Sequence, residues 1–160
     1  MQEPLIVARR GALAEFTLNR PQALNALAVL LGRPPGEVAP MLGDPEASAI
    51  PKPNQAVLVD MPANLLRNPD VYAVVLRSAS ERAFCAGGDV RELVALARGD
   101  HASACASLAF EYRMNWTLEC FSKPTVSLID GMTMGSGVGL VLYNTHRVAG
   151  PRFSFAMPET

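Results

Sequence analysis

The sequence predicts an α/β protein, because strand-like and helix-like segments alternate from residue 70 onward. Two glycine-rich loops support this class, since each follows an apolar run and precedes a helical pattern. The length of 160 residues is that of about one domain. Apolar residues make up 49% and charged residues 18%, which is a composition that favours a packed core over disorder.

Several classes of function are disfavoured by composition. The 14 basic and 15 acidic side chains leave a net charge of −1, so we expect no nucleic-acid partner. No apolar run approaches the roughly 18 residues of a membrane span, and we expect no membrane partner. The first 13 residues show neither a signal peptide nor an amphipathic leader, which favours an intracellular protein. Cys85, Cys105 and Cys120 form no CxxC pair and are interpreted as reduced thiols, with no zinc or other metal site.

The N-terminal residues predict a β-hairpin. Residues 5–8 are apolar, residues 9–11 form a turn that ends in glycine, and apolar residues alternate with others over 12–18. Residues 28–69 contain eight of the 13 prolines, so no long helix fits there. We interpret this stretch as an irregular, proline-rich insert within a single domain that covers residues 1–160.

Elements of both types follow the insert, and each has a local pattern. An apolar β-branched run predicts a buried strand over 71–76, and a glycine-rich loop over 84–89 leads into a short helix over 90–97. Apolar residues at helical spacing predict a helix with a broad apolar face over 103–121, ended by Pro124. The remaining predicted elements are a strand at 125–129, a turn at 130–131, a helix at 135–143, and strands at 147–149 and 153–156.

The two glycine-rich loops, 85–89 and 135–139, are the first candidate site. Glycine lets a backbone approach a ligand closely, and two such loops could each aim one N–H group at a single oxygen, as an oxyanion hole does. The alternative is a pair of ordinary tight turns. Neither loop fits a dinucleotide fingerprint, and neither contains the lysine of a P-loop. Ser136 lacks the flanking glycines of a nucleophile elbow, so its backbone N–H matters more than its hydroxyl.

Titratable residues supply the other candidates. His101 is expected to be a solvated loop residue, and His146 is interpreted as structural. Cys85 is expected to be a small buried thiol, although glycines near a helix start could also stabilise a thiolate. From periodicity alone, Glu111 is a helix-surface acid. Glu159 follows an apolar stretch that would raise the pKa of a carboxyl group and suit acid–base work, while the alternative is a solvated end residue.

Several of these motifs carry a family resemblance. Residues 82–93, RAFCAGGDVREL, resemble the first signature of the crotonase (enoyl-CoA hydratase/isomerase) superfamily, and residues 123–140, KPTVSLIDGMTMGSGVGL, resemble its second. Residues 18–27 are similar to its first CoA-binding turn. Within the superfamily, residues 85–89, 134–139 and 155–160 are most similar to the branch that hydrolyses the thioester of 3-hydroxyisobutyryl-CoA in valine breakdown.

The resemblance implies a crotonase-like ββα spiral and an acyl-CoA substrate, with CoA as part of the substrate and no separate cofactor. It implies that the backbone N–H groups of Gly88 and Ser136 form the oxyanion hole, that Glu159 is catalytic, and that Glu111 contacts the substrate. Gly139 falls where hydratases carry one of two catalytic glutamates, which disfavours hydration. The resemblance further implies a homo-oligomer of the full-length form and a mitochondrial location, or a peroxisomal one in plants.

The sequence also departs from the family pattern. Ser136 replaces the usual glycine, and residues 28–69 replace a helix of about half that length. The aspartate motif that follows the catalytic glutamate in the hydrolase branch is not found before Thr160. We therefore expect the N-terminal portion of a longer domain. The alternatives are another hydratase or isomerase of the same fold, and an inactive CoA-binding fragment.

Overall fold

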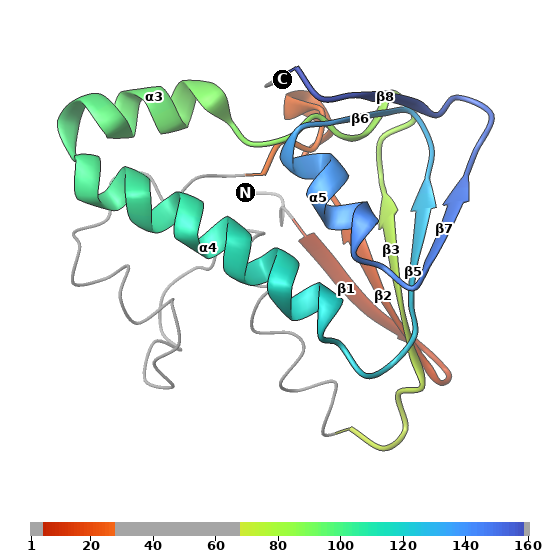
Figure 1. Cartoon of the computed structure of the whole chain (residues 1–160). Coiled ribbons are helices and arrows are strands. Elements are labelled where there is room, and N and C mark those ends of the chain that lie inside the picture. The colour runs from red at the N-terminus through yellow and green to blue at the C-terminus, as the bar shows by residue number, and fades with distance from the viewer. Residues whose placement is uncertain (1–4, 28–67, 159–160) are drawn as a thin grey trace.

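A computed structural model describes residues 5–27 and 68–158 of the chain (Figure 1). The proline-rich insert predicted over 28–69 therefore lies outside the described residues, except for its last two. The described elements, in chain order, are strands β1 (Leu5–Arg10) and β2 (Leu13–Leu18), the 3-10 helix η1 (Pro21–Ala23), β3 (Ala73–Ser78), β4 (Ala83–Cys85), helices α3 (Val90–Gly99) and α4 (His101–Glu119), β5 (Thr125–Ile129), β6 (Met132–Met134), α5 (Ser136–Leu142), β7 (His146–Ala149) and β8 (Ser154–Ala156).

Two sheets organise these elements. The larger sheet has the strand order β1-β2-β3-β5-β7, in which only the β1–β2 hairpin is antiparallel. The smaller sheet has the order β4-β6-β8 and is parallel throughout. The first three strands belong to the larger sheet, and from β3 onward successive strands alternate between the two sheets. Figure 1 shows α4 and α5 in front of the larger sheet. This arrangement is the predicted α/β spiral of ββα units.

The core lies between the larger sheet and these helices. On β2, Phe16 and Leu18 are buried and alternate with partly exposed residues, as the period of two predicted. Phe84 of β4, Met114 of α4 and Leu140 of α5 are fully buried in the same cluster. The strands and helices that flank the glycine loops are therefore fixed by one common core.

Capping residues set the boundary between the two long helices. The side chain of Asp89 accepts a hydrogen bond from the N–H of Glu92 and begins α3. Asp100 accepts one from the N–H of Ser103 at 3.1 Å and begins α4. His101 is thus the first residue of α4 and not a loop residue, although it is exposed as expected. His146 is exposed at the start of β7.

Two expectations from periodicity need correction. The predicted strand over 71–76 begins two residues later, at Ala73, and the short strands β4 and β6 were not predicted. The predicted apolar face of α4 is only partly buried, because Leu108 and Tyr112 are exposed. The buried positions of α4 are instead a mixture of small, polar and apolar residues: Ser103, Ala104, Ser107, Met114 and Leu118.

Candidate active site

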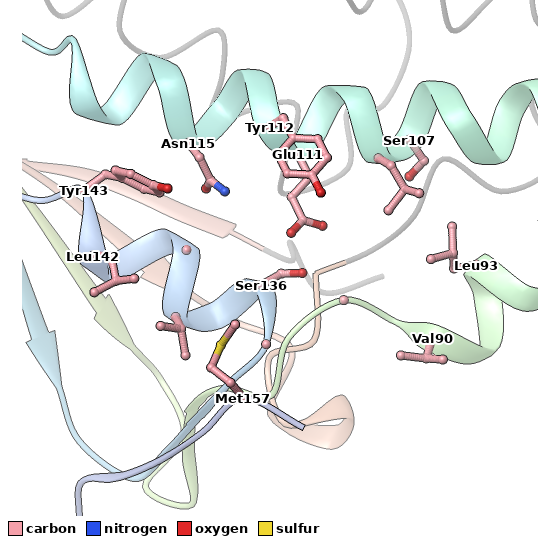
Figure 2. Close-up of a pocket in the computed structure, with 15 residues that line it drawn as sticks. Val90, Leu93, Ser107, Glu111, Tyr112, Asn115, Ser136, Leu142, Tyr143 and Met157 are labelled. Carbon is pink, nitrogen blue, oxygen red and sulfur yellow. The ribbon is translucent and has the colours of Figure 1, made fainter. Parts of the chain in front are cut away.

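A cavity of about 450 Å³ opens between α4, α5 and the two glycine loops (Figure 2). Both glycine loops, the middle of α4 and the residue Met157 after β8 contribute to its lining. Gly88, Ser136 and Glu111, which were singled out from the sequence, all line this one cavity. The fourth predicted site residue, Glu159, lies outside the described residues, two positions after Met157.

The first glycine loop connects β4 to α3 and is held close to the second. Gly87 adopts a φ of +98°, and a Cβ there would lie 2.9 Å from the carbonyl oxygen of Met134. Only glycine satisfies both conditions without strain. The loop pairs with Leu27 through the carbonyl of Gly87 and the N–H of Asp89. This pairing leaves the N–H of Gly88 outside the ladder.

The turn that precedes Leu27 fastens this loop from its other side. Asn25 is buried, and its side-chain oxygen accepts a hydrogen bond from the backbone N–H of Arg20 at 2.7 Å. Its side-chain nitrogen donates a hydrogen bond to the carbonyl of Phe84 at 3.1 Å. The Arg20 guanidinium lies 3.6 Å from the carboxylate of Asp89. The turn over 18–27 therefore supports the position of Gly88, because it contacts Phe84 before that glycine and Asp89 after it.

The second glycine loop connects β6 to α5. Gly135 caps the helix with a φ of +49° and a ψ of −126°, a conformation suited to glycine. Ser136 is the first residue of α5, so its N–H has no acceptor one turn earlier in the helix. Gly137 packs so tightly that a Cβ there would lie 2.5 Å from the carbonyl oxygen of Cys85. The helix start is thus pressed against the end of β4.

These contacts bring Gly88 and Ser136 side by side. A Cβ built on Gly88 would lie 3.5 Å from the Ser136 hydroxyl oxygen, which is an ordinary van der Waals distance. Each residue contributes a backbone N–H that the neighbouring ladder or helix does not use. Two such donors at one end of a cavity can bind one oxygen that carries negative charge.

Glu111 reaches the cavity from the facing helix. Its side chain is half-buried and points from α4 toward Ser136 (Figure 2). Glu111 therefore lines the cavity, which its interpretation from periodicity as a helix-surface acid did not indicate. A carboxylate at this place can accept a hydrogen bond or a proton from a bound molecule.

Cys85 lies under the first loop and is fully buried. Burial, with a smaller contribution from the Glu111 charge, raises the pKa of its thiol to about 12. The thiol is therefore protonated near neutral pH and is a poor nucleophile. This agrees with its interpretation as a small buried thiol, and the alternative of a stabilised thiolate is wrong.

Asn115 is a lining residue that the sequence did not single out. It lies four residues after Glu111 on α4, so the two side chains share one face of the helix. The four-residue spacing from Glu111 could have indicated that Asn115 lies on the same helix face, but a single asparagine in a helix matches no motif for binding or catalysis. Tyr143 and Met157 also line the cavity and were not predicted to do so.

Within residues 5–27 and 68–158, no three His, Cys, Asp or Glu side chains are grouped so that they could hold a metal ion. No helix of these same ranges has the length and apolar character needed to cross a bilayer.

The fold and the cavity define an α/β protein in which successive ββα units present glycine loops to one shared pocket. The chain belongs to the enoyl-CoA hydratase/isomerase family, whose sequence profile matches residues 55–160. Solved structures agree on the crotonase-like fold. An enoyl-CoA hydratase from Rhodobacter sphaeroides superposes with a TM-score of 0.75 at 34% identity, over 98% of this chain and 40% of that one. A carnitinyl-CoA dehydratase from Mycobacterium thermoresistibile has a TM-score of 0.76 at 34% identity, over 99% and 40%.

Curated relatives carry a different activity in their names. The mitochondrial 3-hydroxyisobutyryl-CoA hydrolase of Rattus norvegicus is 35% identical over 98% of this chain and 34% of its own length. The human protein of the same name is 32% identical over 99% of this chain and 35% of its own length. The chain thus spans about a third of the length of these relatives.

Proposed function

We propose that the chain supplies the thioester-binding part of an acyl-CoA hydrolase, and that the substrate is 3-hydroxyisobutyryl-CoA of valine catabolism. The observation that carries the proposal is the placement of Gly88 and Ser136 side by side in a cavity that Glu111 also lines. The names of the curated relatives support the choice of substrate and a mitochondrial location. CoA enters as part of the substrate, and we propose no separate cofactor.

In the proposed reaction, the N–H groups of Gly88 and Ser136 bind the thioester carbonyl oxygen. Attack on the carbonyl carbon places negative charge on that oxygen, and fixed N–H dipoles stabilise it without reorganisation. Glu159 takes a proton from the attacking water, the C–S bond breaks, and the CoA sulfur leaves and is protonated. Direct attack by the Glu159 carboxylate is the alternative first step, with water then hydrolysing the anhydride. Glu111 contacts the acyl group.

A second candidate is a hydratase or isomerase of the same fold. The solved relatives with 34% identity include an enoyl-CoA hydratase and a carnitinyl-CoA dehydratase, which favours this alternative. Glycine at position 139 argues against it, because the resemblance places one of the two carboxylates of hydratases at that position. An inactive CoA-binding protein is a third outcome. We further propose that the full-length form is a homo-oligomer.

The deciding experiment compares 3-hydroxyisobutyryl-CoA with crotonyl-CoA as substrates. Release of free CoA thiol measures hydrolysis, and loss of the enoyl absorbance measures hydration. Because the curated relatives are longer, both this chain and a version extended past Thr160 are assayed. Thiol release from the hydroxylated substrate supports the proposal. Consumption of crotonyl-CoA alone supports a hydratase, and CoA binding without turnover of either substrate supports an inactive protein.

Variants of Ser136 test the backbone donor separately from the side chain. Ser136→Ala keeps the N–H and is expected to retain most activity. Ser136→Pro removes the N–H at the first helical position, where proline is tolerated. Loss of one such donor is expected to lower kcat by about 100- to 1,000-fold. Equal activity of the two folded variants would contradict the oxyanion-hole assignment. Glu159→Gln is expected to abolish turnover while CoA binding is kept.

A further inference from the structure

The carboxamide of Asn115 lies directly against Gly139 of the facing helix. A Cβ built on Gly139 would lie 2.9 Å from the Asn115 nitrogen Nδ2 and 3.1 Å from its oxygen Oδ1. Asn115 therefore occupies the space that a side chain at position 139 would need. Figure 2 shows it pointing from α4 toward α5, on the same side of the helix as Glu111.

The amide oxygen of Asn115 is buried and has no hydrogen-bond partner among the described residues. Buried polar atoms are nearly always paired, so each exception calls for an explanation. In the described part of the chain, only Ser127 and Thr133 share this property, and neither lines the cavity. Asn115 is thus the residue at which an unused polar group and the candidate active site coincide.

The two helices set the spacing of the groups along the cavity. Glu111 and Asn115 are one turn apart on α4, and Ser136 and Gly139 are about one turn apart on α5. One turn measures about 5.4 Å along a helix. A hydroxyl on the third carbon of an acyl group lies three bonds from the carbonyl carbon. With the carbonyl oxygen at Gly88 and Ser136, such a hydroxyl falls within reach of the next turn, where the carboxamide lies.

We propose that Asn115 is a specificity-determining residue that hydrogen-bonds the 3-hydroxyl group of the acyl chain. The inference rests on the proposed function, since it takes the thioester carbonyl to bind at Gly88 and Ser136. A hydroxyl both donates and accepts, and a carboxamide offers both a carbonyl oxygen and an amino group. The hydroxyl therefore pairs with whichever end of the Asn115 amide faces the cavity.

The two tyrosines that line the cavity are less suited to this role. Tyr112 is 73% exposed and Tyr143 is 40% exposed, so water competes for their hydroxyl groups. Two α5 residues that line the same cavity are apolar, Val138 being buried and Leu142 exposed. A partly buried amide discriminates more strongly than an exposed hydroxyl group, because an acyl group without the hydroxyl leaves the amide unpaired.

The test uses two non-hydrolysable CoA analogues in which a methylene replaces the thioester sulfur. One carries the 3-hydroxyisobutyryl group and the other the isobutyryl group, so they differ only in the hydroxyl. Calorimetry measures the Kd of both analogues for the wild-type chain and for Asn115→Leu, which keeps the volume and removes the polar atoms. We expect the wild type to prefer the hydroxylated analogue by about ten-fold, and Asn115→Leu to bind both alike.

The outcomes separate this inference from the proposed function. If the wild type binds neither analogue, the proposed function fails and the role of Asn115 fails with it. If both analogues bind equally well, or if Asn115→Leu keeps the preference, the role of Asn115 is refuted while thioester binding stands. Should circular dichroism show that Asn115→Leu is unfolded, Asn115→Ala replaces it, with the same loss of preference expected.

Discussion

If Asn115 packs against Gly139, the effect of Gly139→Ala on the free energy of unfolding is expected to depend on the residue at position 115. In a helix interior, alanine is favoured over glycine by about 0.8–1.0 kcal/mol. Against this gain, the new Cβ would lie 2.9 Å from the Asn115 nitrogen, and overpacking costs about 1–3 kcal/mol. The clashing atom ends a side chain that can rotate, so we take the lower value of about 1 kcal/mol. The two effects nearly cancel in the wild type.

Removal of the Asn115 carboxamide leaves only the gain. In an Asn115→Ala background, Gly139→Ala is therefore expected to raise the free energy of unfolding by about 1 kcal/mol. Urea unfolding followed by circular dichroism measures all four chains of this double-mutant cycle. If Gly139→Ala has the same effect in both backgrounds, the carboxamide does not occupy the space above Gly139, and the geometric basis for its proposed role is refuted.

Two other glycines, Gly99 and Gly137, provide controls for this experiment. A Cβ on Gly99, at the end of α3, would meet no atom within 4 Å, so Gly99→Ala serves as the control whose effect is the same in both backgrounds. A Cβ on Gly137 would lie 2.5 Å from the carbonyl oxygen of Cys85. Backbone cannot rotate away as a side chain does, so Gly137→Ala is expected to destabilise by about 3 kcal/mol with or without Asn115.

Two titratable groups are expected to shape the pH dependence of stability. Burial raises the pKa of Cys85 from 9.0 to about 12, so the stability that the protonated thiol contributes is complete below pH 9 and is lost as pH rises toward 12. Cys85→Ala should therefore weaken the dependence of the unfolding temperature on pH over this range. Iodoacetamide labelling mapped by mass spectrometry should modify the exposed Cys105 and Cys120 before Cys85. Hydrogen bonds from the Arg152 side chain lower the pKa of Asp130 below 3.8, so its contribution is present above pH 4 and is lost as pH falls further. Asp130→Asn should therefore weaken the loss of stability in acid, measured by thermal unfolding between pH 5 and 2, and an unchanged acid limb would contradict this role for the Arg152 pair.

Local patterns in the sequence predicted the elements that are long enough to show a repeating pattern of apolar residues. The alternation of Ala14, Phe16 and Leu18 predicted the buried face of β2, because a strand exposes alternate residues to one side. Strands β4 and β6 have only three residues each, which is too short for any period to show. Leu108 and Tyr112 were misplaced because a helix that lines a cavity does not bury every apolar residue it carries.

The sequence predicted the backbone loops of the candidate site better than it predicted which side chains line the cavity. Gly87 and Gly135 have positive φ values that only glycine adopts freely, so the loops were visible as glycine clusters. Periodicity places Glu111 on α4 but does not reveal that α5 faces it across a cavity. Asn115 was missed for the same reason, because its significance comes from Gly139 on a helix that is distant in sequence.

The side-by-side placement of Gly88 and Ser136 follows from the topology of the smaller sheet. Strands β4 and β6 pair in parallel, with Ala83 opposite Met132 and Cys85 opposite Thr133. The carboxyl ends of parallel neighbours meet at one edge, so the loops that leave them must lie together. Gly87 and Gly137 then allow the contact to close, because no Cβ separates the two backbones. Both donors belong to the main chain, so serine can stand at position 136 without removing either of them. Under the proposed function, substrate choice is left to the side chains that α4 presents across the cavity, and Asn115 is one of them.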